Sequence, residues 1–109
     1  QHLAQKCDIM CAALDRYFGV SADYKRPKGG IFVWVTLPSH VDSVKLAKLA
    51  GADGISINPG PDWSIAPEAP HQFRLCFGYP DAAIIEEGVM RLANICQQEF
   101  GVPLAIDNI

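Results

Sequence analysis

The segment that most constrains the fold of this chain is residues 31–37, which reads IFVWVTL and is followed by Pro38. β-branched and aromatic side chains favour extended backbone, and proline has no N–H with which to continue a hydrogen-bonded strand. Both alternating sets of side chains in this segment are apolar, whereas a strand with one face in water alternates apolar and polar residues. We therefore expect a central strand that is covered on both sides.

Amphipathic helices are expected before and after this strand, because apolar residues recur there at helical spacing. These helices are expected over residues 2–18, from Ser39 to Gly51 or Gly54, and from Asp81 to about residue 100. The second start rests on Ser39-x-x-Asp42, which resembles a capping box. Gly19 and Gly101 suit the position that follows a helix end.

The other strands are expected to be short and to cover residues 22–26, 55–57 and 72–77. The prolines of Asn58-Pro59-Gly60-Pro61 should end the second of these strands. The order of elements predicts an α+β fold, a two-layer α/β sandwich. In it, a small mixed or antiparallel sheet of about three or four strands packs against the helices.

Composition excludes several classes of protein. The chain has 109 residues, enough for one domain, and with 50% apolar and 19% charged residues it is not intrinsically disordered. Its net charge of −3 argues against a nucleic-acid partner, and a solvated turn accounts for the basic cluster of Lys25, Arg26 and Lys28. The longest apolar run, residues 31–35, is too short to cross a membrane. We expect neither a nucleic-acid nor a membrane partner.

The four cysteines are expected to be reduced and buried. Cys7 and Cys11 share a helical face, Cys76 lies in an apolar strand and Cys96 in an apolar helix stripe, where free cysteine packs as a small hydrophobe. The absence of a C-x-x-C pair and of a histidine cluster predicts no metal site. Reduced cysteines indicate a reducing compartment, so we expect the protein to be cytoplasmic.

Arg74 is the residue that most suggests a binding function, because it interrupts the apolar strand Phe73-Arg74-Leu75-Cys76-Phe77. Arginine is rarely buried unless it is paired, and its planar guanidinium can bind a carboxylate or phosphate through two parallel hydrogen bonds. The residues alone leave two alternatives open. Arg74 is either an anion clamp on a rigid strand or an edge-strand arginine that reaches water or pairs with Asp62 or Glu68.

A stiff loop from residue 58 to residue 70 is the second candidate feature. A loop of this length is often functional. Pro59, Gly60 and Trp63 would then form the wall of a binding cleft. The alternative is a plain connection in which Trp63 folds onto the core. No arrangement of Ser, His and Asp matches a nucleophile motif.

Four motifs stand in a recognisable order along the chain: P-x-G-G-x-F-x-W from Pro27, P-G-x-x-W from Pro59, F-R-L-x-F from Phe73, and I-E-E-G-x-x-x-L from Ile85. Together they resemble the C-terminal small domain of the fold-type I pyridoxal-phosphate aminotransferases. They are most similar to the branch that contains 2-aminoadipate and kynurenine aminotransferases and the aminotransferase-like transcriptional regulators. The resemblance covers residues 1–101 and leaves 102–109 as a C-terminal tail, which we expect to be loosely held.

The resemblance implies an enzyme that transfers an amino group between an amino acid and a 2-oxo acid. Arg74 matches the family's strand arginine, which binds the substrate α-carboxylate. Trp63 replaces the phenylalanine that the family usually has in its P-G-x-x-F loop, and its bulkier ring would narrow the cleft. In the family, the Schiff-base lysine and the residues that hold pyridoxal phosphate belong to a large domain. The resemblance therefore implies that no catalytic residue lies in this chain and that the chain alone is inactive.

The resemblance also implies partners: the protein's own large domain, over which this domain closes, and a second copy in a homodimer. An apolar patch should then be exposed, around Trp63 and the first helix. Other functions remain open at this stage. They are the effector-binding domain of a regulator, an independent small ligand-binding module, and a lyase or decarboxylase on the same fold.

Overall fold

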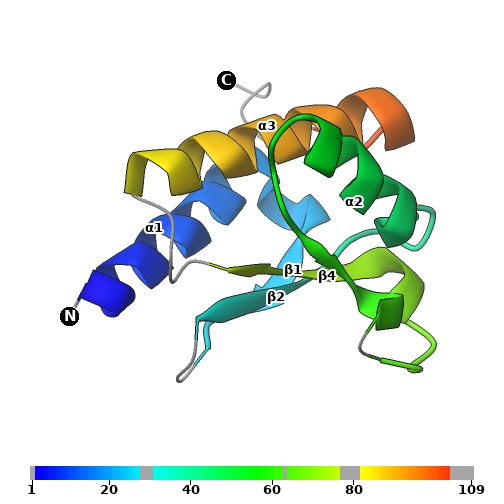
Figure 1. The fold of residues 1–109 in the computed structure, drawn as a ribbon, viewed down its shortest axis with the longest axis horizontal. Coiled ribbons are helices and arrows are strands. Elements are labelled where there is room, and N and C mark those ends of the chain that lie inside the picture. The colour runs from blue at the N-terminus through cyan, green and yellow to red at the C-terminus, as the bar shows by residue number, and fades with distance from the viewer. Residues whose placement is uncertain (1, 28–30, 63, 77–81, 104–109) are drawn as a thin grey trace.

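The computed structural model of the chain describes residues 2–27, 31–62, 64–76 and 82–103. In these ranges the α-helices are α1 (His2–Tyr17), α2 (Ser43–Ala52) and α3 (Ala82–Phe100) (Figure 1). The strands are β1 (Asp23–Lys25), β2 (Phe32–Thr36), β3 (Asn58–Pro59) and β4 (Gln72–Cys76). Short 3-10 turns cover Gly19–Ser21, Gly60–Asp62 and Ala69–His71.

The strands of the described residues form one sheet in the order β1-β2-β4-β3, and every neighbouring pair is antiparallel. The centre of this sheet pairs β2 with β4, so that Val33 lies opposite Leu75 and Trp34 opposite Arg74. The α+β class predicted from the order of elements is confirmed, and the sheet is antiparallel rather than mixed.

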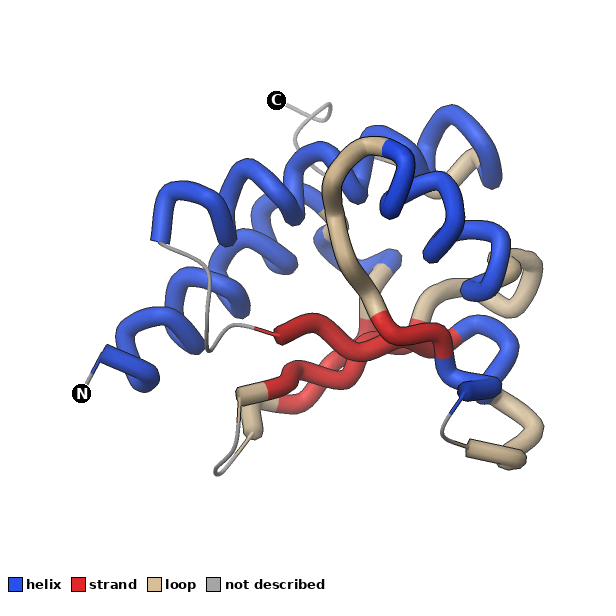
Figure 2. The backbone as a smooth tube through the Cα atoms, viewed as in Figure 1, coloured by secondary structure: helices blue, strands red, loops and turns tan. Residues whose placement is uncertain are grey.

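All three α-helices of the described residues lie on one side of the strands (Figure 2). The core fills the space between these helices and the covered face of the sheet. Its fully buried side chains include Leu14 of α1, Val33 of β2, Phe73 of β4 and Leu92 of α3. The hydroxyl of Tyr17 in α1 donates a hydrogen bond of 3.1 Å to the carboxylate of Glu86 in α3.

The expectation that β2 is covered on both sides is wrong for the part of the chain that the structure describes. Val33 and Val35 are buried, but Phe32 is half-buried and Trp34 is 51% exposed. The physical reason is that no described helix packs on the second face of the sheet. We call this second face, which carries Phe32, Trp34 and Arg74, the open face.

The start of α2 also differs from the prediction. Asp42, and not Ser39, is the N-cap: its Oδ1 accepts hydrogen bonds from the backbone N–H groups of Val44 and Lys45, at 3.0 and 3.2 Å. Before the helix the chain makes a turn in which the Val41 N–H donates to the Pro38 carbonyl, at 3.0 Å. That turn buries Val41 and delays the helix.

The strand expected at residues 55–57 lies directly after them, at Asn58–Pro59. Ile55 does not join the sheet, because its N–H donates to the carbonyl of Ala50 in α2 at 2.8 Å. Pro59 is tolerated in β3 because β3 is an edge strand that pairs only with β4. β3 ends at Pro59 and the chain turns at Gly60, so the strand does stop within Asn58-Pro59-Gly60-Pro61, as predicted, although its own two residues belong to that segment.

The end of the described chain is better anchored than we expected. Gly101 follows α3 with a φ of 71°, as predicted for a helix-ending glycine. Val102 is buried in the core, and its N–H donates to the carbonyl of Cys96 at 3.2 Å, so the loosely held tail does not begin at this residue. Residues 104–109 and the expected N-cap Asp81 lie outside the described residues.

The cysteines are free thiols, as predicted. Cys7, Cys11 and Cys96 are buried, whereas Cys76 lies on the open face and is only half-buried. No α-helix in the described ranges has the length and apolar character needed to cross a bilayer.

Candidate functional site

Arg74 lies in the middle of the open face. It belongs to β4, an inner strand that pairs with β2 on one side and β3 on the other. The alternation of β4 sends Phe73 and Leu75 into the core and Arg74 and Cys76 to the other face, as predicted. Directly opposite Arg74 are Trp34 of β2 and Asn58 of β3. The alternative of an edge-strand arginine is therefore wrong.

The guanidinium of Arg74 lies over the ring of Phe32, with 4.2 Å between its Cζ and the ring centroid. Its Nε is buried and has no hydrogen-bond partner. A buried N–H without an acceptor is destabilising by about 1–3 kcal/mol, because the group has lost its water. Arg74 is therefore held by an aromatic ring while at least one of its donors remains unused.

No carboxylate of the described residues forms an ion pair with Arg74. Each of the other arginines has one: Arg16 pairs with Glu86, Arg26 with Asp8, and Arg91 with Asp53. Asp62 and Glu68, the partners considered from the sequence, are exposed and form no ion pair with Arg74. Within the described part of the chain, Arg74 is the arginine whose charge is left for a ligand.

A cavity of about 570 Å³ opens beside Arg74 on the open face. Its walls combine cationic and apolar side chains, namely Lys25, Arg26, Pro27, Ile31, Phe32, Trp34 and Arg74. Arg26 already forms an ion pair with Asp8, and the hydrogen bond between these side chains raises the pKa of the Arg26 guanidinium. The cavity can accept a small anion with an apolar part. The apolar patch expected around Trp63 and the first helix stays a prediction, because Trp63 lies outside the described residues.

The other predicted site residues lie elsewhere. Pro59 is buried in β3 opposite Phe73, on the face of the sheet that Arg74 does not share. Gly60 is buried where the chain turns, and a Cβ there would overlap the backbone carbonyl of Ala69. Trp63 lies outside the described residues. The cleft wall formed by these residues stays a prediction.

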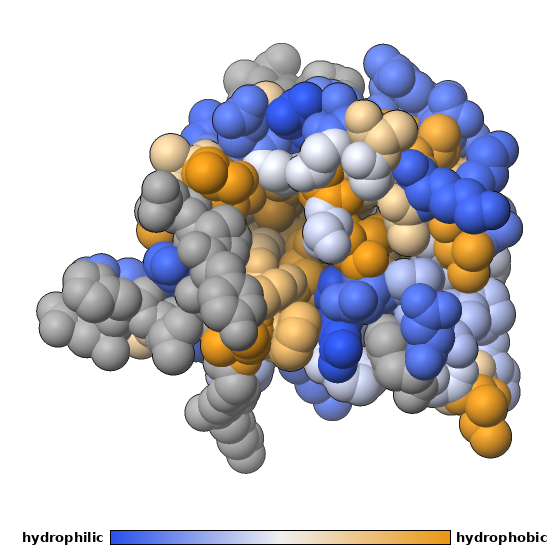
Figure 3. Space-filling model, viewed as in Figure 1, coloured by the Kyte–Doolittle hydropathy of each residue, from blue (hydrophilic) through white to orange (hydrophobic). Residues whose placement is uncertain are grey.

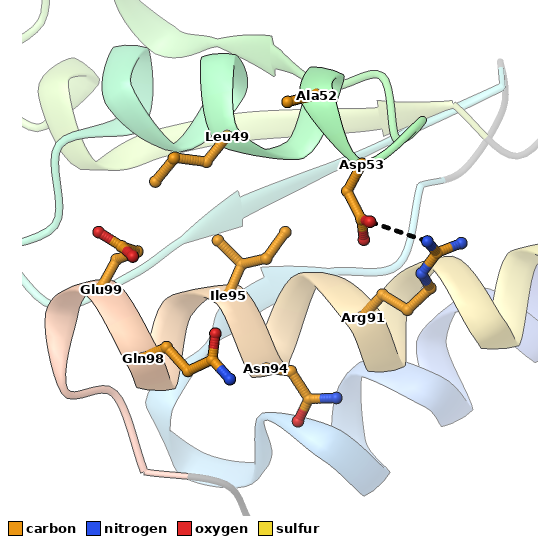
Figure 4. Close-up of a pocket in the computed structure, with 8 residues that line it drawn as sticks. All are labelled: Leu49, Ala52, Asp53, Arg91, Asn94, Ile95, Gln98 and Glu99. Carbon is orange, nitrogen blue, oxygen red and sulfur yellow. Dashed lines mark hydrogen bonds and ion pairs between the residues drawn. The ribbon is translucent and has the colours of Figure 1, made fainter.

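Two further hollows do not include Arg74. One has a volume of about 500 Å³ and is lined mainly by apolar residues of α1, β4, α3 and the segment between α2 and β3. Figure 3 shows a hollow in this face of the molecule with hydrophobic surface inside it. The other lies between α2 and α3 and has a volume of about 410 Å³. There, Arg91 of α3 reaches Asp53 at the end of α2, with 2.8 Å between Nη2 and Oδ1 (Figure 4). That ion pair links the two helices and leaves Arg91 less available to a ligand.

The thiols of Cys11 and Cys96 are poor nucleophiles. Burial, and to a smaller extent the neighbouring Cys7, raises the pKa of Cys11 from 9.0 to about 11. Burial also raises the pKa of Cys96 to about 12. The thiolate is the reactive form, so both side chains are inert near neutral pH. In the described ranges, no three His, Cys, Asp or Glu side chains gather as metal ligands.

Sequence reasoning missed Phe32, Lys25 and Arg26 as neighbours of Arg74. A signal was present, because Phe32 stands two residues before Trp34 and shares its face of the strand. What the sequence did not supply is the register that sets β2 against β4.

Known proteins resemble this chain in sequence. No protein-family model matches it. The aromatic-amino-acid aminotransferase 1 of Thermococcus litoralis is 33% identical over 93 residues, which are 85% of this chain and 22% of that protein. The 2-aminoadipate transaminase of Thermus thermophilus is 34% identical over 90 residues, 83% of this chain and 23% of that protein. An uncharacterized HTH-type transcriptional regulator of Bacillus subtilis is 28% identical over 98 residues, 90% of this chain and 20% of that protein.

Solved structures agree with these relatives. The kynurenine aminotransferase of Pyrococcus horikoshii superposes with a TM-score of 0.80 at 33% identity, over 89% of this chain and 24% of that one. The alpha-aminoadipate aminotransferase of Thermus thermophilus gives a TM-score of 0.77 at 31% identity, over 91% of this chain and 25% of that one.

Sequence and fold together relate this chain to the fold-type I aminotransferases. Within them, the relatives include the branch of 2-aminoadipate and kynurenine aminotransferases, which confirms the resemblance predicted from the motifs. The chain spans about a quarter of the length of the relatives it matches.

Proposed function

We propose that this chain is the C-terminal small domain of a pyridoxal-phosphate-dependent aminotransferase and that Arg74 binds the α-carboxylate of the substrate. The full-length protein would move an amino group between an amino acid and a 2-oxo acid. The relatives support this reaction class, because several of them are aminotransferases by name. Homodimerisation and closure over a large domain belong to the same proposal.

The proposal rests on the position of Arg74 and on its lack of a carboxylate partner among the described residues. Arg74 stands on an inner strand and keeps a buried donor without an acceptor. A carboxylate offers two oxygens at the spacing that a guanidinium fork requires. Binding one would satisfy the donors and neutralise the charge in a single step.

Arg74 would act by positioning the substrate. Its strand is hydrogen-bonded on both sides, so the guanidinium is presented from a rigid base. Fixing the carboxylate there also fixes the direction of the α-amino group, and such orientation lowers the barrier by several kcal/mol in favourable cases. Arg74 binds and orients the substrate and transfers no proton.

The cofactor would be pyridoxal 5′-phosphate, which supplies an electron sink for the transfer when it is bound. The residues described here do not fit as its anchor, since none of the described lysines is buried. We therefore assign the cofactor to the large domain and attribute no step to this chain beyond binding and orienting the substrate.

The test compares two proteins. The full-length protein that contains this chain, supplied with cofactor, should produce a new amino acid from an amino acid and a 2-oxo acid. The 109-residue chain alone should neither do so nor yield a stoichiometric lysine adduct of the cofactor after borohydride reduction. A full-length protein without transaminase activity, or a single-lysine adduct on the chain alone, would contradict the proposal.

A regulator is the second candidate, because the chain is also 28% identical to an HTH-type transcriptional regulator. In that case the same Arg74 would bind an effector carboxylate behind a DNA-binding segment. Retention of a DNA fragment by the full-length protein, together with absence of transamination, would favour this function over the enzyme.

A further inference from the structure

We propose that Phe32 is the positioning residue of the carboxylate site: its ring fixes the guanidinium of Arg74 and leaves the donors of that group free. This inference rests on the proposed function of Arg74 as the carboxylate clamp. It adds a second residue, from a different strand, on which the clamp depends.

The geometry supports contact between these two side chains rather than chance proximity. Trp34 is the direct neighbour of Arg74 across the strands, and Phe32 is the diagonal neighbour on the same face. Diagonal neighbours lie roughly 7–8 Å apart at Cα, within reach of long and aromatic side chains. The Arg74 side chain therefore leans along the sheet until its Cζ is 4.2 Å from the Phe32 ring centroid.

The ring holds the guanidinium in a way that a carboxylate cannot. Asp8, Glu86 and Asp53 hold the other arginines through ion pairs, which use N–H donors and cancel the charge. A ring contacts the flat face of a guanidinium and leaves the N–H groups in its plane available. Phe32 can thus restrict Arg74 without competing with the ligand.

This restriction matters because arginine has a long, flexible side chain. A free side chain would lose its rotamer freedom when the carboxylate binds, and that loss would weaken binding. Phe32 itself is half-buried, and its strand pairs with β4 at Cys76, so the ring is held on the sheet before the ligand arrives. Phe32 should therefore affect substrate affinity and leave the chemical step nearly unchanged.

The experiment uses the full-length protein with Phe32→Leu and Phe32→Ile, which keep an apolar side chain but remove the ring, and Phe32→Tyr, which keeps the ring. Phe100→Leu is the matched control, since Phe100 is also partly buried and has a cation, Lys45, over its ring at 5.9 Å. Phe100 belongs to α3, which covers the face of the sheet opposite to Arg74. Steady-state kinetics give kcat and KM for an amino acid and for an amine without a carboxylate, and propionate is titrated as an inhibitor.

The aliphatic variants should raise the KM for the amino acid and the inhibition constant of propionate by about threefold to tenfold, the factor expected for a partly desolvated cation–π contact. Their kcat, and their rate with the amine, should stay within about twofold. Phe32→Tyr and Phe100→Leu should behave like the unaltered protein. A change in kcat, an equal loss with the amine, or no rescue by tyrosine would overturn the role of Phe32.

Arg74→Ala in the same assay separates the two proposals. If Arg74→Ala weakens amino-acid turnover but the aliphatic Phe32 variants do not, the inference about Phe32 is wrong and the clamp stands. If Arg74→Ala has no selective effect, the proposed function itself is wrong. If neither aliphatic variant folds, as judged by circular dichroism and thermal unfolding, Phe32 is a core residue and the positioning role is rejected.

Discussion

Single residues in this chain carry roles that their neighbours cannot replace, and Gly60 is an example. It lies where the turn after β3 meets the turn before β4, and it is buried. A Cβ there would overlap the carbonyl oxygen and carbon of Ala69, which are backbone atoms that cannot rotate away. The close approach of these two turns therefore requires glycine at this position.

Gly60→Ala should reduce the free energy of unfolding by about 2–3 kcal/mol, as expected for overpacking against backbone. Gly88→Ala is the control, because nothing lies within 4 Å of a Cβ placed there and the position is inside α3. That change should stabilise the protein by about 0.5–1 kcal/mol through helix propensity. Urea unfolding of both variants measures the difference, and equal stabilities would contradict the account of the Gly60 turn.

At the scale of elements, α2 shows how a tertiary contact selects among local signals. Ser39 and Asp42 are both favourable N-cap residues, and the sequence alone favoured the earlier one. Burial of Val41 in the preceding turn decides the matter, and Asp42 caps the helix. The capping hydrogen bonds identify the true start more firmly than the sequence pattern does.

Asp42→Ala should therefore cost about 1 kcal/mol of stability, the usual value for loss of an N-cap. Ser39→Ala should change stability by less than about 0.5 kcal/mol, as surface substitutions usually do. Chemical denaturation of the two variants under identical conditions provides the comparison. A larger loss for Ser39→Ala than for Asp42→Ala would show that α2 begins where the sequence suggested.

The order of helices and strands could be predicted from the sequence because periodicity and turn residues are local signals. Details set by distant contacts could not. Residues 55–57 have strand-like composition, yet the hydrogen bond from Ile55 to Ala50 keeps the first of them out of the sheet. Residues 31–37 are apolar on both faces, but the described chain covers only one.

The candidate site, too, could be predicted only where local sequence signals were enough. Arg74 could be identified from one charged residue in an apolar strand, together with the motif around it. Its contact with Phe32 depends on the pairing of β2 with β4, two strands far apart in the sequence. No local pattern predicts which of several aromatic residues an arginine will meet across a sheet.

For the whole molecule, the raised pKa values of Cys11, Cys96 and Tyr24 predict a response to alkaline pH. The folded-state pKa of Cys11 is about 11 and that of Cys96 about 12, both above the ordinary value of 9.0. Burial and a hydrogen bond to Asp15 also raise the pKa of Tyr24. In each case the folded protein holds a proton that the unfolded chain releases at lower pH. The contribution of these groups to stability is thus fully present below about pH 9 and is lost as the pH rises toward 12.

The free energy of unfolding, measured under reducing conditions from pH 8 to pH 11, should be constant up to about pH 9 and then fall. Cys11→Ala removes one of the shifted groups. Its decline between pH 9 and pH 11 should be shallower than that of the unaltered protein. A free energy that rises or stays flat across this range would contradict the account of these groups.

At the scale of the whole molecule, the residues of the candidate site lie on the open face of the sheet. The described helices cover one side of the sheet, and Arg74, Phe32 and Trp34 are left on the other, beside a cavity that mixes cationic and apolar walls. We propose that Arg74 on this face binds the carboxylate of an amino-acid substrate in the full-length protein.

The most direct measurement of this claim is kcat/KM of the full-length protein with Arg74→Ala, for an amino acid and for an amine that lacks the carboxylate. Hydrogen bonds to charged groups contribute about 1.5–3 kcal/mol each, so losing a two-bond clamp should lower kcat/KM for the amino acid by about a hundredfold or more. Arg74→Lys, which keeps the charge but not the fork, should fall in between. Turnover of the amine should barely change. An equal loss for amine and amino acid, or a variant that merely unfolds, would make Arg74 a structural arginine and contradict the claim.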